Sequence, residues 1–292
     1  MENCTHLVIS GGGFGGISII GAIACLIDNN KWPTKLRAYS GCSVGAIFAV
    51  LLILDYTPSD LLDIIKTFPF ASIDDWDFEC FMQNYGIDKG ERQQNILSDL
   101  VFNKTNVRDF TLKTFYEYTK KDLYISVTNV SQKKIDYLHH TTHPDLPLLL
   151  AIKMTTCIPL YFPRCIYNGE VFVDGGIKDN FPMTPFVSQK DVPLDAILGI
   201  KLSKTQTDGD NIISYISSII NCISSKADSV LDSVDESDTT PFILKMDIKY
   251  PLVSFDHSDD EVNELHDSGY ASCYCHLMKP DAQTSTSGVK QV

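Results

Sequence analysis

Residues 5–16 read THLVISGGGFGG, and residues 36–45 read LRAYSGCSVG. Each stretch begins with a short β-rich run and continues into a glycine-rich turn. An apolar segment of helical length follows each turn, over residues 17–27 and 44–54. A strand, a turn and a helix that repeat in this order are typical of βαβ units. The sequence therefore predicts an α/β fold built on a parallel sheet.

The alternation of strands and helices continues along the chain. Further helices are expected over residues 59–68, 93–102, 111–120, 148–155 and 259–277. Further strands are expected over residues 123–130, 134–140, 171–173, 196–202 and 242–250. Residues 203–240 are rich in Ser and Asp but carry apolar residues at helical spacing, so we interpret them as an insertion with one amphipathic helix. The Ser/Thr/Gln-rich tail, residues 278–292, is expected to be disordered.

The charge of the chain restricts its partners. The 292 residues include 24 Lys and Arg against 37 Asp and Glu, a formal charge of −13. Such a surface argues against nucleic acid as a partner and against docking on anionic membranes through a basic patch. Any contact with lipid would come from apolar side chains. Six aromatic residues from Phe68 to Tyr85 are a candidate lid or interfacial surface. Ordinary core packing beneath a loop explains them slightly better.

Nothing in the sequence indicates export or a membrane span. Residues 1–6 lack the positively charged region of a signal peptide. The longest apolar run, residues 44–54, is too short to cross a bilayer. The nine cysteines are scattered and odd in number, as reduced thiols commonly are, and no spacing indicates a metal site. We therefore expect a cytoplasmic protein with peripheral membrane contact and no metal.

Residues 41–45, GCSVG, match the G-x-S-x-G pattern between a predicted strand and a predicted helix. A nucleophile elbow, a tight turn that exposes a reactive serine, requires this setting. Gly41 and Gly45 allow the turn, and Ser43 is the candidate nucleophile. The N-terminal N–H groups of the following helix would stabilise negative charge at the same point. The alternative is an ordinary strand-to-helix turn, because the pattern is short.

The first glycine-rich turn, residues 11–16, allows two interpretations. The free backbone N–H groups of such a loop can form an oxyanion hole, which stabilises the tetrahedral intermediate of acyl transfer. Gly11, Gly13 and Gly16 also match the dinucleotide-binding fingerprint G-x-G-x-x-G. That fingerprint requires an acidic residue near the end of the second strand, and this chain has none there. The nucleotide interpretation is therefore the weaker one.

A third motif, Asp-Gly-Gly at residues 174–176, follows a short apolar strand. The carboxylate of Asp174 could act there as a base for Ser43, although a capped glycine turn is a common alternative. A catalytic triad drawn with His257, His266 or His276 is a further alternative. None of these histidines lies in a distinctive sequence context.

Taken together, the three motifs resemble those of the patatin-like phospholipases. That family combines a glycine-rich oxyanion loop, a G-x-S-x-G nucleophile and a distant D-G-[AG]. Residues 174–182, DGGIKDNFP, also match its D-G-G-x-x-x-N-x-P pattern. Residues 154–163, MTTCIPLYFP, are similar to its segment before that strand, and residues 265–271 resemble part of its closing helix. The resemblance covers residues 5–277, nearly the whole chain.

The resemblance implies an α/β fold, a three-layer sandwich in which helices flank a mainly parallel central sheet, within one domain over residues 5–277. It implies Ser43 as nucleophile and Asp174 as base, without a histidine, and an acyl-enzyme intermediate. It implies no cofactor and no metal. Loop N–H groups would hold the oxyanion, and the implied donors are Gly11, Gly12 and Gly13. Five more glycines complete the motifs: Gly16, Gly41, Gly45, Gly175 and Gly176.

The implied substrates are acyl lipids: phospholipids, lysophospholipids or neutral glycerides, reached by transient contact with a membrane or micelle. Besides its lipid substrate, the protein could require a second partner that activates it, and the sequence does not identify that partner. The alternatives are a small-ester hydrolase or acyltransferase of the same fold, and a catalytically degenerate lipid-binding protein. Two departures from the family stand out. Gly15 replaces a frequent Arg or Lys of the loop, which is expected to weaken support of the oxyanion. Residues 155–157, Thr-Thr-Cys, replace the more usual Ala and Ser, and we expect this change to affect packing rather than chemistry.

Overall fold

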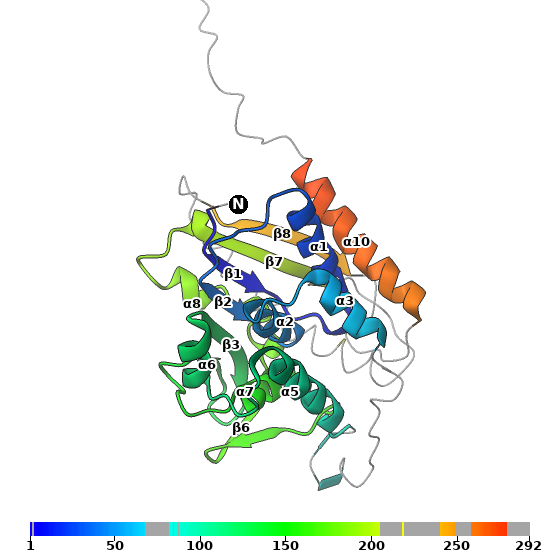
Figure 1. Cartoon of the computed structure of the whole chain (residues 1–292). Coiled ribbons are helices and arrows are strands. Elements are labelled where there is room, and N and C mark those ends of the chain that lie inside the picture. The colour runs from blue at the N-terminus through cyan, green and yellow to red at the C-terminus, as the bar shows by residue number, and fades with distance from the viewer. Residues whose placement is uncertain are drawn as a thin grey trace, which may run out of the picture.

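The computed structural model describes residues 1, 3–67, 82–83, 85–86, 88–204, 218, 240–248 and 258–278. Within these residues an eight-stranded sheet has the order β5-β6-β3-β2-β1-β7-β8, with β4 paired to β3 (Figure 1). The strands are β1 (His6–Ile9), β2 (Ala38–Gly41), β3 (Asp122–Asn129), β4 (Lys134–Leu138), β5 (Cys165–Tyr167), β6 (Glu170–Asp174), β7 (Ile197–Lys204) and β8 (Phe242–Ile248). The helices are α1 (Ile17–Asp28), α2 (Val44–Ile53), α3 (Pro58–Thr67), α5 (Glu91–Thr105), α6 (Leu112–Thr119), α7 (Leu148–Thr156), α8 (Thr184–Val187) and α10 (Asp259–Leu277).

The sheet is mainly parallel, as the repeated strand–turn–helix pattern predicts. β1 lies between β2 and β7 and is parallel to both, β2 is parallel to β3, and β7 is parallel to β8. β4, β5 and β6 add an antiparallel part at the β3 side of the sheet. Because the parallel strands share one direction, the loops that follow β1 and β2 leave the sheet at the same end.

Side-chain alternation along the strands divides the core into two unequal parts. Successive side chains of a strand point to opposite faces. On β1, Leu7 and Ile9 join the larger apolar cluster, whereas Val8 joins a smaller one with Phe186 of α8. On β3, Tyr124 packs against that smaller cluster as well. Helices α1, α2, α3, α5, α6, α7 and α10 all contribute to the larger cluster. The expected three-layer sandwich is thus confirmed, with a thin second helical layer around α8.

Helices α1 and α10 pack so closely that their backbones touch (Figure 1). A Cβ atom placed on Gly21 of α1 would lie 1.9 Å from the carbonyl oxygen of His266. A Cβ atom placed on Gly269 of α10 would lie 1.9 Å from the carbonyl oxygen of Ser18. The Ser18 hydroxyl also donates to the Leu265 carbonyl at 3.0 Å. No side chain fits at either glycine without moving the helices apart, and the contact joins a helix near the start of the chain to the last described helix.

Each predicted helix and strand that lies within the described residues is present, with end shifts of one to three residues at most positions. The expected hairpin is formed by β3 and β4. The short strand β5 was not predicted, because three residues carry too little periodic pattern. Most of the aromatic stretch from Phe68 to Tyr85, nearly all of the 203–240 insertion with its amphipathic helix, His257, and residues 279–292 of the tail lie outside the described residues. Among the described helices, none has the length and apolar character of a bilayer span.

Candidate active site

The parallel strands bring two of the motifs together at one end of the sheet. The glycine-rich loop follows β1, and Ser43 follows its neighbour β2. A Cβ atom on Gly11 would lie 3.2 Å from the Cβ of Ser43 and 2.5 Å from Oδ1 of Asn180. The loop and the serine are therefore in contact, and a side chain at position 11 would displace one of them.

Ser43 has the backbone conformation of a nucleophile elbow. Its dihedral angles are φ 51° and ψ −126°, a region that a residue with a side chain rarely adopts. The turn is tight on both sides: a Cβ on Gly41 would lie 2.6 Å from the amide nitrogen of Ala46, and one on Gly45 would lie 2.5 Å from the Ile9 carbonyl oxygen. Ser43 is buried and immediately precedes α2, whose first-turn N–H groups face the same region.

The glycine loop offers backbone donors, but not all three of those expected. The N–H of Gly11 donates to the Asn180 carbonyl at 3.0 Å, and Nδ2 of Asn180 donates back to the Gly11 carbonyl at 3.2 Å. Gly11 is thus a structural contact and its N–H is already used. Within the described residues, the N–H groups of Gly12 and Gly13 have no protein acceptor. Gly13 has φ 55°, which favours glycine there.

The loop that carries Asn180 is itself anchored to the β3–β4 hairpin. Tyr137 of β4 donates its hydroxyl to Oδ2 of Asp179 at 2.6 Å, and Oδ1 of Asp179 accepts from the Phe181 N–H at 3.2 Å. Burial and the neighbouring Asp179 carboxylate raise the pKa of Tyr137, so its hydroxyl stays protonated and able to donate. This anchoring fixes Asn180, and through it the start of the glycine loop.

Strand β3 aligns Asp174 with the nucleophile turn. Gly41, at the end of β2, is paired with Ile125, and Asp174, at the end of β6, is paired with Val127. The Asp174 side chain is buried. Its Oδ1 accepts from the Gly176 N–H at 2.7 Å and lies 3.7 Å from Sγ of Cys42, the residue before Ser43.

Both glycines of the Asp-Gly-Gly motif lie in close packing. A Cβ on Gly175 would lie 2.4 Å from the Ser126 carbonyl oxygen, and one on Gly176 would lie 3.0 Å from Oδ1 of Asp174. Gly16 has a comparable role in the first loop, where a Cβ would lie 2.9 Å from Cγ1 of Val44. The structure therefore gathers all the residues of the three motifs at the same end of the sheet.

Sequence reasoning missed the role of Thr155, at the end of α7. Its hydroxyl accepts from the Ser43 N–H at 2.8 Å and donates to the Ser126 carbonyl at 2.7 Å. Ser43, Thr155 and Ser126 are all buried. Beyond packing, this hydroxyl therefore holds the backbone of the candidate nucleophile, and an effect of this position on chemistry is a prediction. A polar residue at the end of an otherwise apolar helix was the available signal.

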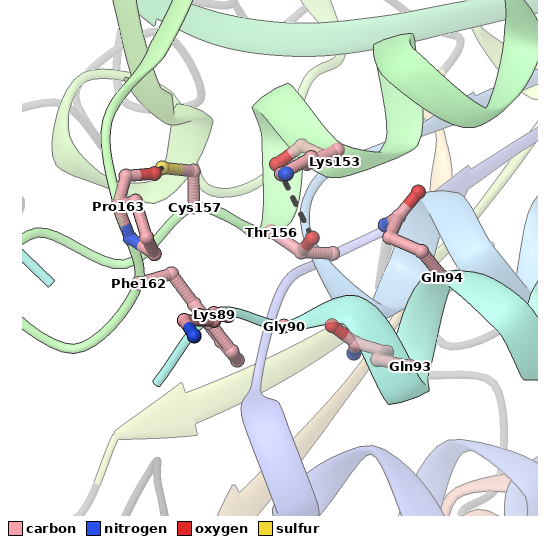
Figure 2. A pocket seen from close by; sticks show the side chains of 9 residues that line it. All are labelled: Lys89, Gly90, Gln93, Gln94, Lys153, Thr156, Cys157, Phe162 and Pro163. Carbon is pink, nitrogen blue, oxygen red and sulfur yellow. Dashed lines mark hydrogen bonds between the residues drawn. The ribbon is translucent and has the colours of Figure 1, made fainter. Parts of the chain in front are cut away.

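A pocket opens on another side of α7, next to the strand that carries Asp174 (Figure 2). It is lined by Lys89, Gly90, Gln93, Gln94, Lys153, Thr156, Cys157, Phe162 and Pro163. The Cys157 carbonyl accepts from the Asp174 N–H at 2.9 Å, which ties the pocket wall to the candidate base. The thiol of Cys157 donates to the Pro163 carbonyl at 2.6 Å, and a hydrogen bond with Cys165 together with burial raises the pKa of Cys157. This thiol is therefore protonated and structural.

The described histidines make their contacts elsewhere. Nδ1 of His266 lies 3.2 Å from Oδ1 of Asp267, and the ring of His276 packs edge-on against Phe242. Both belong to α10. His6, His139 and His140 lie at the opposite end of the parallel strands, near the first residues of β1 and β3. These contacts of His266 and His276 give no support to the triad drawn with either histidine.

Comparison with known proteins places this arrangement in context. Residues 7–187 match the family model described as patatin-like phospholipase. Over 181 residues the chain is 31% identical to a protein named "Probable lipid hydrolase 463L" from Invertebrate iridescent virus 6, a match that covers 61% of each chain. Over 186 residues it is 24% identical to a lysophospholipase of Meyerozyma guilliermondii, covering 61% of this chain and 11% of that protein.

Solved structures share the fold at low sequence identity. VipD from Legionella pneumophila superposes with a TM-score of 0.67 and 16% identity, over 94% of this chain and 67% of that one. ExoU in its complex with SpcU, from Pseudomonas aeruginosa, gives a TM-score of 0.52 and 18% identity, over 94% of this chain and 51% of that one. These chains and the viral and yeast relatives are longer than the region they share with this chain.

Proposed function

This chain belongs to the patatin-like phospholipase family, a family of lipid hydrolases, and we propose that it cleaves fatty-acyl esters of glycerolipids with a dyad of Ser43 and Asp174. One observation carries the proposal. Ser43 has a strained backbone between the strand that ends at Asp174 and a glycine loop in which two N–H groups have no acceptor among the described residues. Strain of this kind is retained where the fold needs a particular side-chain position.

The proposed reaction proceeds in two halves. The Ser43 oxygen attacks the ester carbonyl while Asp174 accepts the hydroxyl proton, and the N–H groups of Gly12 and Gly13 stabilise the oxyanion. Collapse of the tetrahedral intermediate breaks the ester C–O bond, and Asp174 returns the proton to the leaving alcohol. Water then attacks the acyl-enzyme, loses its proton to Asp174, and releases the fatty acid as Ser43 regains a proton. Every step uses groups of this chain and water.

The backbone donors of the glycine loop explain why activity is expected although Gly15 replaces a basic residue. A basic residue at that position would add charge near the oxyanion, but backbone donors supply the hydrogen bonds themselves. Removing one oxyanion donor typically costs about 100- to 1,000-fold in rate, so the two donors at Gly12 and Gly13 are the larger contribution. We propose a slower enzyme, not an inactive lipid-binding protein.

The proposed substrate is lipid in a membrane or micelle. The formal charge of −13 disfavours attraction to anionic lipid, so contact is transient and depends on apolar side chains. We propose that residues 5–277 act as one domain, because α10 is packed onto α1. All of the cysteines in the described part of the chain are free, and this supports the proposed cytoplasmic location.

The test is fatty-acid release from mixed phosphatidylcholine micelles in EDTA, with wild type, Ser43→Ala, Asp174→Asn and Ser18→Ala. Ser18 is a buried serine on α1 whose hydroxyl bonds to α10, and it serves as the matched control. We expect release to fall at least 1,000-fold in the first two variants and to persist in the control. A long-chain fluorophosphonate should label wild type but not Ser43→Ala. Release that survives Ser43→Ala would refute the dyad. Hydrolysis confined to monomeric esters would indicate the small-ester alternative, and a folded but inactive wild type would indicate the lipid-binding one.

A further inference from the structure

Two histidines and an aspartate come together at the end of the sheet away from Ser43. Asp122 is the first residue of β3, and His139 and His140 directly follow β4. The antiparallel pairing of β3 and β4, with Ile125 opposite Leu138, brings these three residues side by side. Sequence spacing gave no sign of the cluster, because its members are separated by the whole hairpin.

Two of the three distances between the donor atoms are close to those around a tetrahedral metal ion. Nε2 of His139 lies 3.1 Å and Nδ1 of His140 lies 3.7 Å from Oδ1 of Asp122, and the three ligand atoms lie within 4.8 Å of one another. Zinc binds nitrogen and oxygen donors at about 2.0–2.2 Å, so two donors at a tetrahedral angle lie roughly 3.3–3.5 Å apart. The two separations from Oδ1 of Asp122, 3.1 Å and 3.7 Å, lie on either side of that value.

Neighbouring groups fix both rings in this orientation. Nδ1 of His139 is paired with the Thr141 hydroxyl at 2.8 Å, which leaves Nε2 toward Asp122. Metal-binding histidines usually have such a second partner on the other ring nitrogen. Tyr124 stacks on His139 with ring centroids 4.0 Å apart and an interplanar angle of 4°. Stacking positions the ring without occupying its donor atom.

His140 supplies an independent sign of a missing ligand. Tyr116 stacks on its ring at 3.8 Å and 7°. Its Nδ1 is buried, yet among the described residues it has no hydrogen-bond partner. Buried polar atoms are nearly always paired, and an unpaired one calls for an explanation such as an ion.

We propose that Asp122, His139 and His140 bind one divalent transition-metal ion, with Zn²⁺ as the best match. The donor set of two imidazoles and one carboxylate suits Zn²⁺, Co²⁺ or Ni²⁺ better than Mg²⁺ or Ca²⁺, which prefer oxygen ligands. The Asp122 side chain is 37% exposed, so solvent reaches the cluster and water can complete the coordination. The ion would join the start of β3 to the end of β4 and stabilise the hairpin.

This site is separate from the proposed dyad. His6, Ala38 and Asp122 are paired across the first residues of β1, β2 and β3, whereas Ser43 follows the last residue of β2. Three residue steps of β2 span about 10 Å. Metal binding is therefore expected to change stability and to leave lipid hydrolysis in place, and its test does not depend on catalytic activity.

The test adds ZnCl₂ or CoCl₂ to the EDTA-stripped and desalted full chain. The background is Cys275→Ser, because Cys275 is the exposed thiol among the described cysteines. We expect one ion per chain by isothermal titration. A 100-fold excess of Zn²⁺ over the Kd should raise Tm by about 5 °C. Bound Co²⁺ should show visible d–d absorption without a thiolate charge-transfer band.

Two variants and one control decide the assignment. His139→Gln removes one histidine ligand. His140→Phe removes the second histidine ligand but keeps an aromatic ring stacked on Tyr116. His143→Gln is the control, because its Nδ1 is paired with Thr142 outside the cluster. We expect the zinc-dependent rise in Tm to vanish in both ligand variants and to remain in the control. An equal rise in His140→Phe, a thiolate signature for Co²⁺, or no stoichiometric binding to wild type would each overturn the proposal.

Discussion

Replacing Thr155 by Val tests whether one hydroxyl holds the nucleophile in place. The substitution keeps the shape of the side chain but puts a methyl group where Oγ1 lies 2.8 Å from the Ser43 nitrogen and 2.7 Å from the Ser126 oxygen. A buried N–H and a buried carbonyl both lose their partner, at about 1–3 kcal/mol each. Carbon also needs about 3.5 Å or more from these atoms, so the Ser43 backbone must move.

We expect Thr155→Val to lower the free energy of unfolding by about 2–4 kcal/mol in urea titrations. We also expect kcat for micellar lipid to fall about 100-fold, because a displacement of about 1 Å at a catalytic group can cost that much. KM should change little, because the substitution alters the position of the nucleophile rather than a group proposed to bind the lipid. Thr155→Ser keeps the hydroxyl and should recover most of the activity.

Thr128→Val is the matched control for this experiment. Thr128 is a buried residue of β3 whose hydroxyl has no hydrogen-bond partner among the described residues. The same exchange of atoms should leave its unfolding free energy unchanged or raise it by about 1 kcal/mol. Full activity in Thr155→Val would refute the positioning role, and so would an equal loss of kcat in Thr128→Val.

Three further predictions follow from strain, burial and close packing. Ser43→Gly should abolish fatty-acid release. It should also raise the unfolding free energy by about 1 kcal/mol, since glycine tolerates φ 51°. A lower unfolding free energy in urea titrations would contradict the inference that the Ser43 backbone is strained. Burial lowers the pKa of His6 from 6.5 to about 4, so the unfolded chain binds more protons between these values. The free energy of unfolding should therefore fall by about 2 kcal/mol from pH 7 to pH 5 in EDTA. His6→Gln, which keeps a polar neighbour for Phe186, should reduce this dependence of the unfolding free energy on pH. Gly269→Ala should lower the unfolding free energy by about 3 kcal/mol or more, because its Cβ would lie 1.9 Å from the Ser18 carbonyl oxygen. An unchanged Tm would show that α1 and α10 can move apart without loss of stability.

Local signals in the sequence predicted most of the fold. The two strand–turn–helix units at the start of the chain predicted the parallel sheet, because periodicity and glycine turns are properties of contiguous residues. The unequal layers were not predictable in this way. They depend on which face of the sheet each distant helix covers, and Val8 and Phe186 of the smaller cluster are far apart in the chain.

The candidate site was predictable where a motif is continuous. The positions of Ser43 and Asp174 were expected from short patterns. The role of Thr155 was not, because its two partners belong to different strands and no spacing rule connects them. The Asn180 contact that uses the Gly11 N–H, and the Asp122 cluster, are likewise products of tertiary contact. In this chain, continuous patterns predicted the candidate groups, and only the structure revealed the residues that contact them.

The contact between α1 and α10 has a consequence for how the protein is made. Ser43 and the almost fully buried α1 are synthesised before β7, which begins at Ile197, and before α10, which begins at Asp259. At about 5–20 residues per second, a ribosome needs roughly 10–40 s to cover that interval. During this time the nascent chain exposes an apolar helix but has no enclosed oxyanion loop. The α1–α10 contact, and with it the proposed active site, is therefore complete only after α10 has left the ribosome.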